Sequence, residues 1–267
     1  MLPHMSTAIS PADAHTATIL DQFTRQAGTF GQVLGHAEAI DLLRHSCALT
    51  REDTVLDVAC GPGLLALDFA RHSAWVTALD LTPKMLEEAE KRARDANIAN
   101  VTWTLGDAYS LPFEDNTFST VVSRFAFHHY QDPKAAFAEM VRVTQPGGKV
   151  LVADVHMDED ISATFDRLEH LRDSSHVHAL TAKEHGRLWD EHHLRDLQAF
   201  VYTVEIPLQV QLDASVFGSE RGTWEREVRA DVGQNRTGYA PRVEAQGVVL
   251  SYPIGVTVGT KDGRRNR

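Results

Sequence analysis

The sequence predicts an α/β fold in which parallel strands alternate with helices, and two observations carry this prediction. From residue 51 to about residue 155, short apolar runs alternate with helix-like stretches, as in a parallel sheet with crossover helices. Within that region, residues 55–58 read as a buried strand, followed by a Gly-Pro-Gly turn and an apolar helix. A strand, a Gly-x-Gly turn and a helix together present backbone groups to a nucleotide-like ligand.

Length and composition limit the possible classes of protein. The chain has 267 residues and a formal charge of −11, which suits one domain with additions and argues against a general nucleic-acid surface. No apolar run approaches the roughly 18 residues of a membrane span, and the first residues lack the pattern of a signal peptide. Two cysteines, Cys47 and Cys60, give no disulfide framework. We expect a cytoplasmic monomer or homodimer that binds neither nucleic acid nor membrane.

The elements can be assigned in chain order. Residues 14–26 and 36–48 have helical periodicity, and a turn is expected between them, around Phe30 in its glycine-flanked position. Further strands are expected at 75–79, 101–105, 117–123, 149–155, 200–211 and 247–260, with helices at 83–96 and 132–143. Residues 158–196 are polar, histidine-rich and helix-like, whereas 213–243 read as helix and loop.

The glycine turn fits two cofactors. Residues 61–66 match G-x-G-x-x-A, and Asp80 follows about one strand later, as in a dinucleotide site. However, Asp57 at the end of the strand would repel a pyrophosphate and attract an ammonium group. Pro62 removes one backbone N–H from a loop that would otherwise cradle phosphate. These two residues favour S-adenosylmethionine (SAM) over NAD, although an NAD-dependent oxidoreductase remains the alternative from another class.

Four motifs carry a resemblance to a known family. They are Val55-Leu-Asp-Val-Ala-Cys-Gly-Pro-Gly63, Val76-Thr-Ala-Leu-Asp80, Gly106-Asp-Ala-Tyr-Ser-Leu-Pro-Phe113 and Pro146-Gly-Gly-Lys-Val-Leu-Val152. Together they resemble the class I SAM-dependent methyltransferases. Residues 123–133 and 23–30 are similar to the ubiquinone/menaquinone-biosynthesis-like branch of that family, which methylates small, often aromatic, molecules.

The resemblance implies a Rossmann-like, seven-stranded, mostly parallel sheet whose strand at 247–260 is antiparallel. It implies lid helices at 1–50, a SAM-binding core at 51–157, a helical cap at 158–198, strands and a helix completing the sheet at 199–260, and a tail at 261–267. A narrower resemblance, to the methyltransferases of toxoflavin biosynthesis, implies methylation of ring nitrogens of an azapteridine. C- or O-methylation of a quinone or phenolic precursor is the alternative, and a non-catalytic SAM-binding protein is a third possibility.

The same resemblance assigns the cofactor site, whose product would be S-adenosylhomocysteine. The candidate residues are Asp57, Ala59, Gly61, Gly63, Asp80, Leu81, Met85, Asp107, Ala108 and Ser123. Asp80 can accept both ribose hydroxyls with its two oxygens. Its alternative role is to cap the helix that begins at Thr82-Pro83.

Candidate residues for the acceptor are Phe30, Arg124, Phe127, His128, Arg172, His176 and Trp189, and the catalytic candidates are His128, His129 and Arg124. Adjacent histidines cannot share one helix face, so we expect at most one of them to meet the ligand. We expect no metal, because His-x-x-x-His spacing and cysteine ligands are missing. Transfer from a sulfonium depends mainly on proximity, so for an acidic heteroaromatic acceptor we expect neither histidine to act as a general base.

Overall fold

The computed structural model describes residues 14–30, 39–192 and 194–263. The helices are α1 (Ala14–Phe30), α2 (Ile40–Ser46), α3 (Leu64–Ala70), α4 (Pro83–Asp95), α5 (Pro133–Val143), α6 (Ser162–Arg172), α7 (Ala182–Asp190), α8 (Leu208–Ala214) and α9 (Arg221–Ala230), with a 3-10 turn η1 (Phe127–His129). The strands are β1 (Thr54–Val58), β2 (Trp75–Asp80), β3 (Val101–Leu105), β4 (Phe118–Arg124), β5 (Thr144–Val155), β6 (Leu194–Pro207), β7 (Arg242–Glu244) and β8 (Gly247–Lys261).

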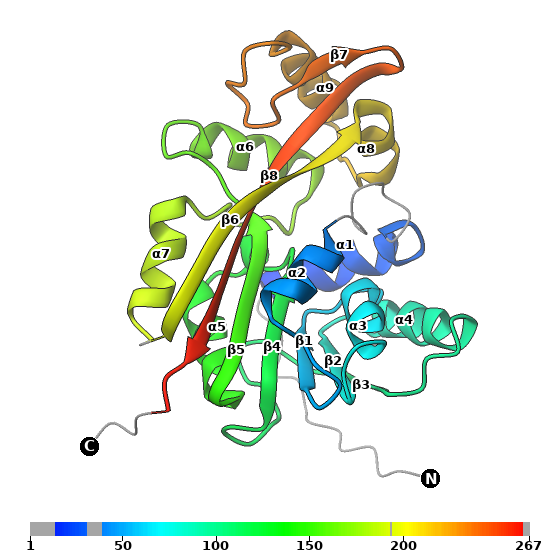
Figure 1. Cartoon of the computed structure of the whole chain (residues 1–267). Helices are drawn as coiled ribbons and strands as arrows, with labels where there is room; N and C mark the ends of the chain where they lie inside the picture. Colours follow the sequence, from blue (N-terminus) through cyan, green and yellow to red (C-terminus); the bar gives the residue numbers. More distant parts are fainter. Residues whose placement is uncertain (1–13, 31–38, 193, 264–267) are drawn as a thin grey trace.

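The strands form one twisted sheet with the order β3-β2-β1-β4-β5-β8-β6 (Figure 1). Strands β1 to β5 are parallel where they pair, and β8 is antiparallel to both β5 and β6. The predicted mostly parallel sheet and its antiparallel last strand are therefore confirmed. Within the described residues, the short β7 pairs with β8 and adds an eighth strand to the seven that were expected.

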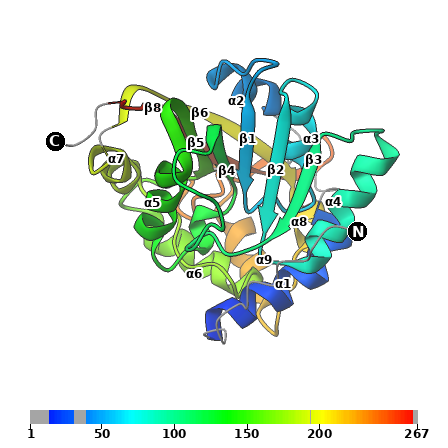
Figure 2. The same ribbon diagram turned by 90° about the horizontal axis from the view of Figure 1, so that it is seen from below.

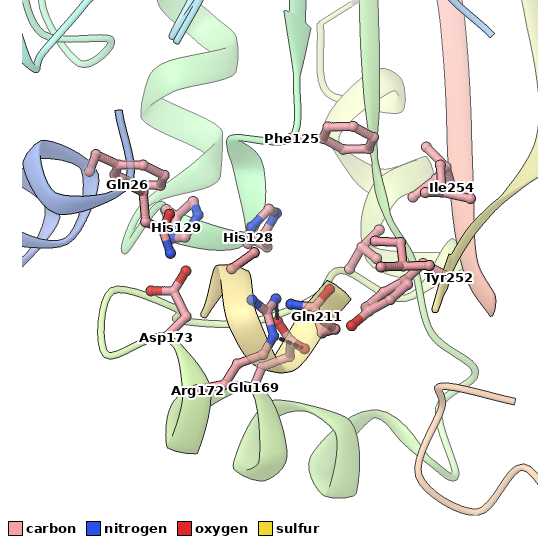
Figure 3. A pocket seen from close by; sticks show the side chains of 15 residues that line it. Gln26, Phe125, His128, His129, Glu169, Arg172, Asp173, Gln211, Tyr252 and Ile254 are labelled. Carbon is pink, nitrogen blue, oxygen red and sulfur yellow. Dashed lines mark hydrogen bonds and ion pairs between the residues drawn. The ribbon is translucent and has the colours of Figure 1, made fainter. Parts of the chain in front are cut away.

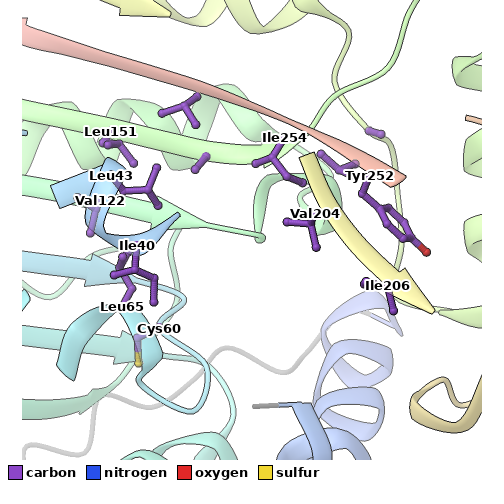
Figure 4. Close-up of a cluster of buried hydrophobic side chains, with 14 of the residues drawn as sticks. Ile40, Leu43, Cys60, Leu65, Val122, Leu151, Val204, Ile206, Tyr252 and Ile254 are labelled. Atoms are coloured by element: carbon purple, nitrogen blue, oxygen red, sulfur yellow. The ribbon is translucent and has the colours of Figure 1, made fainter. Parts of the chain in front are cut away.

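Both faces of the sheet are covered, because successive strand residues point to opposite sides. On β5, Leu151 belongs to one buried cluster, which also contains residues of α2 and α3, whereas Val150 belongs to a second cluster with residues of α5 and α7. Figure 4 shows part of the first cluster, in which Ile40 and Leu43 of α2 lie over the sheet near Val122. A sheet buried on both faces explains why its central strands are continuous apolar runs.

The N-terminal helices differ from the expectation. Helix α1 continues through Gly28 to Phe30, so the expected turn does not begin at Gly28. It packs against α4 and reaches α8, beside the end of the sheet (Figures 1 and 2). Helix α2 begins at Ile40 and packs on α3; the earlier part of the expected helix, and the side chain of Phe30, lie outside the described residues.

The residue ranges of the cap and of the strand after it also differ from those expected from the sequence. Helices α6 and α7 form the helical part of the cap, but β6 already begins at Leu194 and ends at Pro207, where α8 takes over. Strand β6 is at the edge of the sheet, and Arg195 to Ala199 are exposed. An edge strand that faces water lacks the alternating apolar pattern by which strands are recognised, so its first residues resembled the polar helical segment before it.

A substitution at Gly63 tests how tightly the start of α3 packs against Trp103 and Ala89. Its φ is +79°, and a Cβ there would lie 2.9 Å from the Trp103 ring and 3.0 Å from the Ala89 Cβ. We predict that Gly63→Ala lowers the free energy of unfolding by about 2–4 kcal/mol, from left-handed backbone strain and overpacking together. Urea unfolding of the purified variant measures this loss.

Gly186→Ala is the matched control, because this exposed glycine of α7 has no atom within 4 Å of a built Cβ. An alanine there should leave stability unchanged or raise it by about 0.5–1 kcal/mol, since alanine favours the helix. Equal effects of the two substitutions would show that packing around Gly63 is not tight.

Candidate functional site

A large hollow opens at the carboxyl ends of β1 and β2, and helix α1 covers it. The hollow holds about 920 Å³ of space between atoms. Its lining includes seven of the residues assigned to the cofactor from the sequence: Ala59, Gly61, Asp80, Leu81, Met85, Asp107 and Ala108. His15, Thr16, Ile19 and Phe23 of α1 line it as well. We call this space the first hollow.

Asp80 ties the glycine turn to the start of α4. Its Oδ2 accepts a hydrogen bond from the Gly61 N–H at 2.8 Å, and its Oδ1 accepts one from the Thr82 N–H at 2.8 Å. Burial raises the pKa of Asp80, and these N–H groups oppose the rise. A carboxylate has about four lone-pair positions, so Asp80 keeps acceptor capacity toward the hollow. The structural role and a ligand-binding role are therefore compatible.

The turn itself has room for a ligand at Gly61. Its φ is +53°, and no atom lies within 4 Å of a built Cβ, so a ligand can approach the backbone there. The residue before the turn, Ala59, is strained, with a φ of 58°. Gly63 is buried and meets Trp103 and Ala89 rather than the first hollow. Its contribution is close packing between α3 and its neighbours.

Asp57 is a buried carboxyl group, one oxygen of which has no partner among the described residues. It is 1% exposed, and its Oδ2 has no hydrogen-bond partner within the part of the chain that the structure describes. Burial and the nearby charge of Asp80 raise its pKa to about 8. Asp57 lines a small recess beside the glycine turn together with Ala59 and Arg124. An ammonium group bound in this recess would stabilise the ionised form.

A second hollow adjoins the first. It holds about 810 Å³ of space and is lined by residues of η1, β5, α6, β6, α8 and β8 (Figure 3). Phe23, Phe125 and His129 line both hollows, and we call these three residues the shared wall. Phe125 follows β4 directly and has a φ of 57°, which is rare for an aromatic residue. The two spaces therefore adjoin, with these three side chains at their common border.

His128 and His129 have different surroundings. The Nδ1 of His128 lies 2.6 Å from Oδ1 of Asp154, which is at the end of β5. Burial lowers the pKa of His128, but the charge of Asp154 and this hydrogen bond exceed that effect, so the pKa is raised. His129 donates from Nδ1 to the Ser175 carbonyl at 3.0 Å, and burial and the charge of His128 lower its pKa to about 3.

One side of the second hollow is polar. Arg172 of α6 bonds to Glu169 through Nε at 2.9 Å and through Nη2. Glu169 also accepts a hydrogen bond from the Tyr239 hydroxyl at 2.7 Å. Figure 3 shows Arg172, Glu169 and Gln211 together, opposite Phe125. The hollow thus combines aromatic and aliphatic walls with hydrogen-bonding groups, which suits a planar molecule with polar edges.

The residues assigned to the acceptor divide into two groups. His128 and Arg172 line the second hollow, whereas Arg124 lines the first, with its Nε 3.3 Å from the Tyr202 hydroxyl and its guanidinium over the Phe125 ring. Three residues that were assigned to the acceptor do not line either hollow. Phe127 and Trp189 are buried in the core with Phe137, and His176 is buried against Asp166.

Ser123 is also placed away from both hollows. It is fully buried, and its Oγ donates to the Val58 carbonyl at 3.0 Å, which joins β4 to β1. Sequence reasoning placed Ser123 at the strand end correctly but not the direction of its side chain. It also missed Phe23, Asp154, Gln211 and Tyr252. Only Asp154 carried a signal, because it is an acid near the carboxyl end of a predicted strand.

The described residues contain neither a metal-binding cluster nor a membrane-spanning helix. Across residues 14–30, 39–192 and 194–263, no three His, Cys, Asp or Glu side chains are grouped so as to hold a metal ion. Over the same ranges, no helix has the length and apolarity needed to cross a membrane.

Comparison with known proteins agrees with this geometry. Residues 56–152 match a family model described as a methyltransferase domain. An uncharacterized methyltransferase of Bacillus subtilis, YcgJ, is 30% identical over 182 residues, 67% of this chain and 70% of YcgJ. The chain belongs to the methyltransferase family. The crystal structure of YcgJ superposes on this methyltransferase with a TM-score of 0.78 and 24% identity, covering 86% of this chain and all of YcgJ.

Two further relatives widen the comparison. The ubiquinone/menaquinone biosynthesis C-methyltransferase UbiE of Roseobacter denitrificans is 40% identical over 103 residues, 38% of this chain and 41% of UbiE. A phosphoethanolamine N-methyltransferase of Haemonchus contortus, solved with S-adenosylhomocysteine, shares the fold with a TM-score of 0.65 and 18% identity, over 95% of this methyltransferase and 62% of that chain. The resemblance to class I methyltransferases and to their ubiquinone/menaquinone-biosynthesis-like branch is confirmed, and the NAD-dependent alternative loses its support, whereas the narrower resemblance to toxoflavin biosynthesis stays a prediction.

Asp57 generates a prediction about stability and pH. The folded protein holds the Asp57 proton up to pH about 8, whereas the ordinary pKa is 3.8. Ionisation of Asp57 therefore lowers the free energy of unfolding as the pH rises between these values. Asp57→Asn removes this effect, so the variant should gain roughly 2–4 kcal/mol relative to wild type between pH 5 and pH 8.

Urea unfolding of the ligand-free protein at both pH values measures the difference. The exposed Asp95→Asn is the control for a general loss of charge, and it should follow wild type. Parallel pH profiles for Asp57→Asn and wild type would show that Asp57 is already ionised in the folded protein.

Proposed function

We propose that this methyltransferase uses SAM to methylate a small aromatic or heteroaromatic molecule. The observation that carries the proposal is the shared wall of Phe23, Phe125 and His129. A donor in the first hollow and an acceptor in the second would meet there without water between them. Because in-line transfer depends mainly on close approach and alignment, adjacent hollows with a common wall are the arrangement that this reaction needs.

The first hollow and the recess beside it together offer a group for each part of SAM. Asp57 offers an unpartnered, buried carboxyl to the ammonium group, and Asp80 offers acceptor capacity to the ribose hydroxyls. Asp107 and Ala108 offer an acceptor and a donor to an adenine amino group and ring nitrogen, and Leu81 and Met85 offer apolar surface in the same hollow. SAM, when bound, supplies an electrophilic methyl group on a sulfonium; the protein supplies its orientation and a dry surrounding.

For the acceptor, we favour a ring nitrogen of an azapteridine of the toxoflavin type. Such a molecule is planar and has carbonyl and N–H edges. The second hollow offers the flat ring of Phe125, the aliphatic side chain of Val155, and polar groups on Arg172 and Gln211. A second candidate is C- or O-methylation of a quinone or phenolic precursor, which the 40% identity with UbiE over 103 residues supports. Both acceptors need a flat pocket with a few polar contacts.

A screen with methyl-labelled SAM tests the proposal. Azapteridines, pteridines, quinols and phenols are incubated with the purified protein, and labelled products are identified by mass spectrometry. We expect transfer to a heteroaromatic ring nitrogen. Transfer to a quinol or phenol alone would favour the second candidate, whereas binding of S-adenosylhomocysteine without transfer to any acceptor would indicate a non-catalytic binding protein.

Asp80 gives a quantitative prediction for the cofactor. Asp80→Ala removes the acceptor for the ribose and for the Gly61 and Thr82 N–H groups. We predict a loss of about 1.5–3 kcal/mol in the binding of S-adenosylhomocysteine, as measured by calorimetry. Asp132→Ala is the matched control, because Asp132 also sits at a helix N-terminus, bonding to the Ala135 N–H, but lies outside the first hollow. Equal affinity of wild type and Asp80→Ala would leave Asp80 a structural role only.

A further inference from the structure

Asp154 fixes the orientation of His128 in the wall of the second hollow. Besides the His128 ring at 2.6 Å, Asp154 accepts hydrogen bonds from the backbone N–H groups of Phe127 at 2.6 Å, His128 at 3.3 Å and Val155 at 2.7 Å. Every group that bonds to this carboxylate is a donor, so it is held as an acceptor. Burial alone would raise the pKa of Asp154, but His128 and these bonds bring it below its usual value.

This arrangement determines the tautomer of His128. When the ring is neutral, its proton lies on Nδ1, facing Asp154, and Nε2 carries the lone pair. The side chain is 15% exposed and lines the second hollow. No described residue is hydrogen-bonded to its Nε2. A general base in an enzyme is typically held in orientation by a second side chain, here Asp154, while its basic atom faces the substrate pocket.

The charges around His128 determine whether an acceptor enters the second hollow as a neutral molecule or as an anion. Among the described residues, the ionisable groups around it are Asp154 of β5, His129 of η1, Glu169 and Arg172 of α6, Asp173 and His176 after α6, and His156 and His185, which line a small cavity beside it. Arg172 is paired with Glu169. Asp173 accepts from the Ser175 hydroxyl at 2.5 Å, and, against its burial, the His129 ring, Arg172 and Ser175 lower its pKa. With Asp154 and Asp173 ionised nearby, like charge disfavours the entry of an anion.

We propose that His128, positioned by Asp154, is the general base of the proposed methyl transfer. This inference rests on the function proposed above and assigns the acceptor class: a molecule that enters neutral, with a proton on the nitrogen or oxygen to be methylated. The acceptor's X–H bond breaks toward Nε2 of His128 while its electron pair forms the X–CH₃ bond. The C–S bond electrons stay on sulfur, giving S-adenosylhomocysteine, and His128 later releases the proton to water.

His129 is not suited to this role. Its pKa is lowered to about 3, and its Nδ1 is held by the Ser175 carbonyl, so it is a weak base near neutral pH. Its ring lies against Phe23, with centroids 5.0 Å apart. It can accept a hydrogen bond from a ligand and keep the shared wall in place. The inference departs from the expectation drawn from the sequence, which identified no partner for either histidine.

His128→Asn is the decisive variant. Asparagine keeps an N–H that can reach Asp154 but has no atom at the position of Nε2. We expect the single-turnover rate of wild type, preloaded with SAM, to rise with pH through an apparent pKa above 6.5, because only the neutral ring accepts a proton. In His128→Asn the rate should fall by about 10²–10⁴-fold, and its pH profile should lose the rising limb at this pKa. His129→Asn, which alters the shared wall, should keep the rise of the rate with pH whatever its effect on the rate itself.

Asp154→Asn and an NMR titration provide an independent readout. Loss of the carboxylate charge should move the pKa of His128 downward, and the limb of the rate profile should move with it. A merely structural role for Asp154 would change stability without moving that limb.

The outcomes separate the two proposals. A protein that transfers no methyl group to any acceptor overturns the proposed function, and this inference with it. Methyl transfer with a wild-type rate and pH profile in His128→Asn overturns the inference alone.

Discussion

The site depends on the reversal of strand order between β1 and β4. These strands pair in parallel, with Val58 opposite Ser123, and β2 and β5 continue the sheet in opposite directions from them. Just past this pairing, Ala59 and Phe125 take left-handed φ values of 58° and 57°. Sharp exits at neighbouring strand ends separate the two loops and leave a crevice between them. The first hollow lies on the β2 side, the second on the β5 side, and Phe125 lines both.

Three buried carboxyl groups stand at this edge of the sheet, and each is stabilised differently. Asp80 bonds to two backbone N–H groups, and Asp154 bonds to three together with an imidazole. Asp57 keeps one oxygen without a partner among the described residues. Burying an ionised carboxyl without a partner costs free energy, and a cationic ligand bound beside it would offset that cost. The same edge therefore holds a carboxylate bonded to backbone N–H groups, one bonded to a histidine ring, and one with an oxygen that has no partner among the described residues.

What the sequence could predict was local. The β1 strand, the glycine turn and Asp80 lie within one strand–turn–helix–strand unit, where spacing alone fixes their relative positions, and all fell where expected. The second hollow is different, because Val155, Arg172, Gln211 and Tyr252, which line it, come from β5, α6, α8 and β8. Their meeting depends on how those elements pack. No spacing distinguishes Arg172, which faces the hollow, from Trp189, which fills the core against Phe137.

The crystal structure of the protein with S-adenosylhomocysteine tests the central claim of this account most directly. We expect the ligand in the first hollow, with its ribose at Asp80, its ammonium group toward Asp57, and its sulfur at the shared wall of Phe23, Phe125 and His129, facing the second hollow. A ligand bound elsewhere, or one whose sulfur is turned away from the shared wall, would contradict the claim that the two hollows hold donor and acceptor.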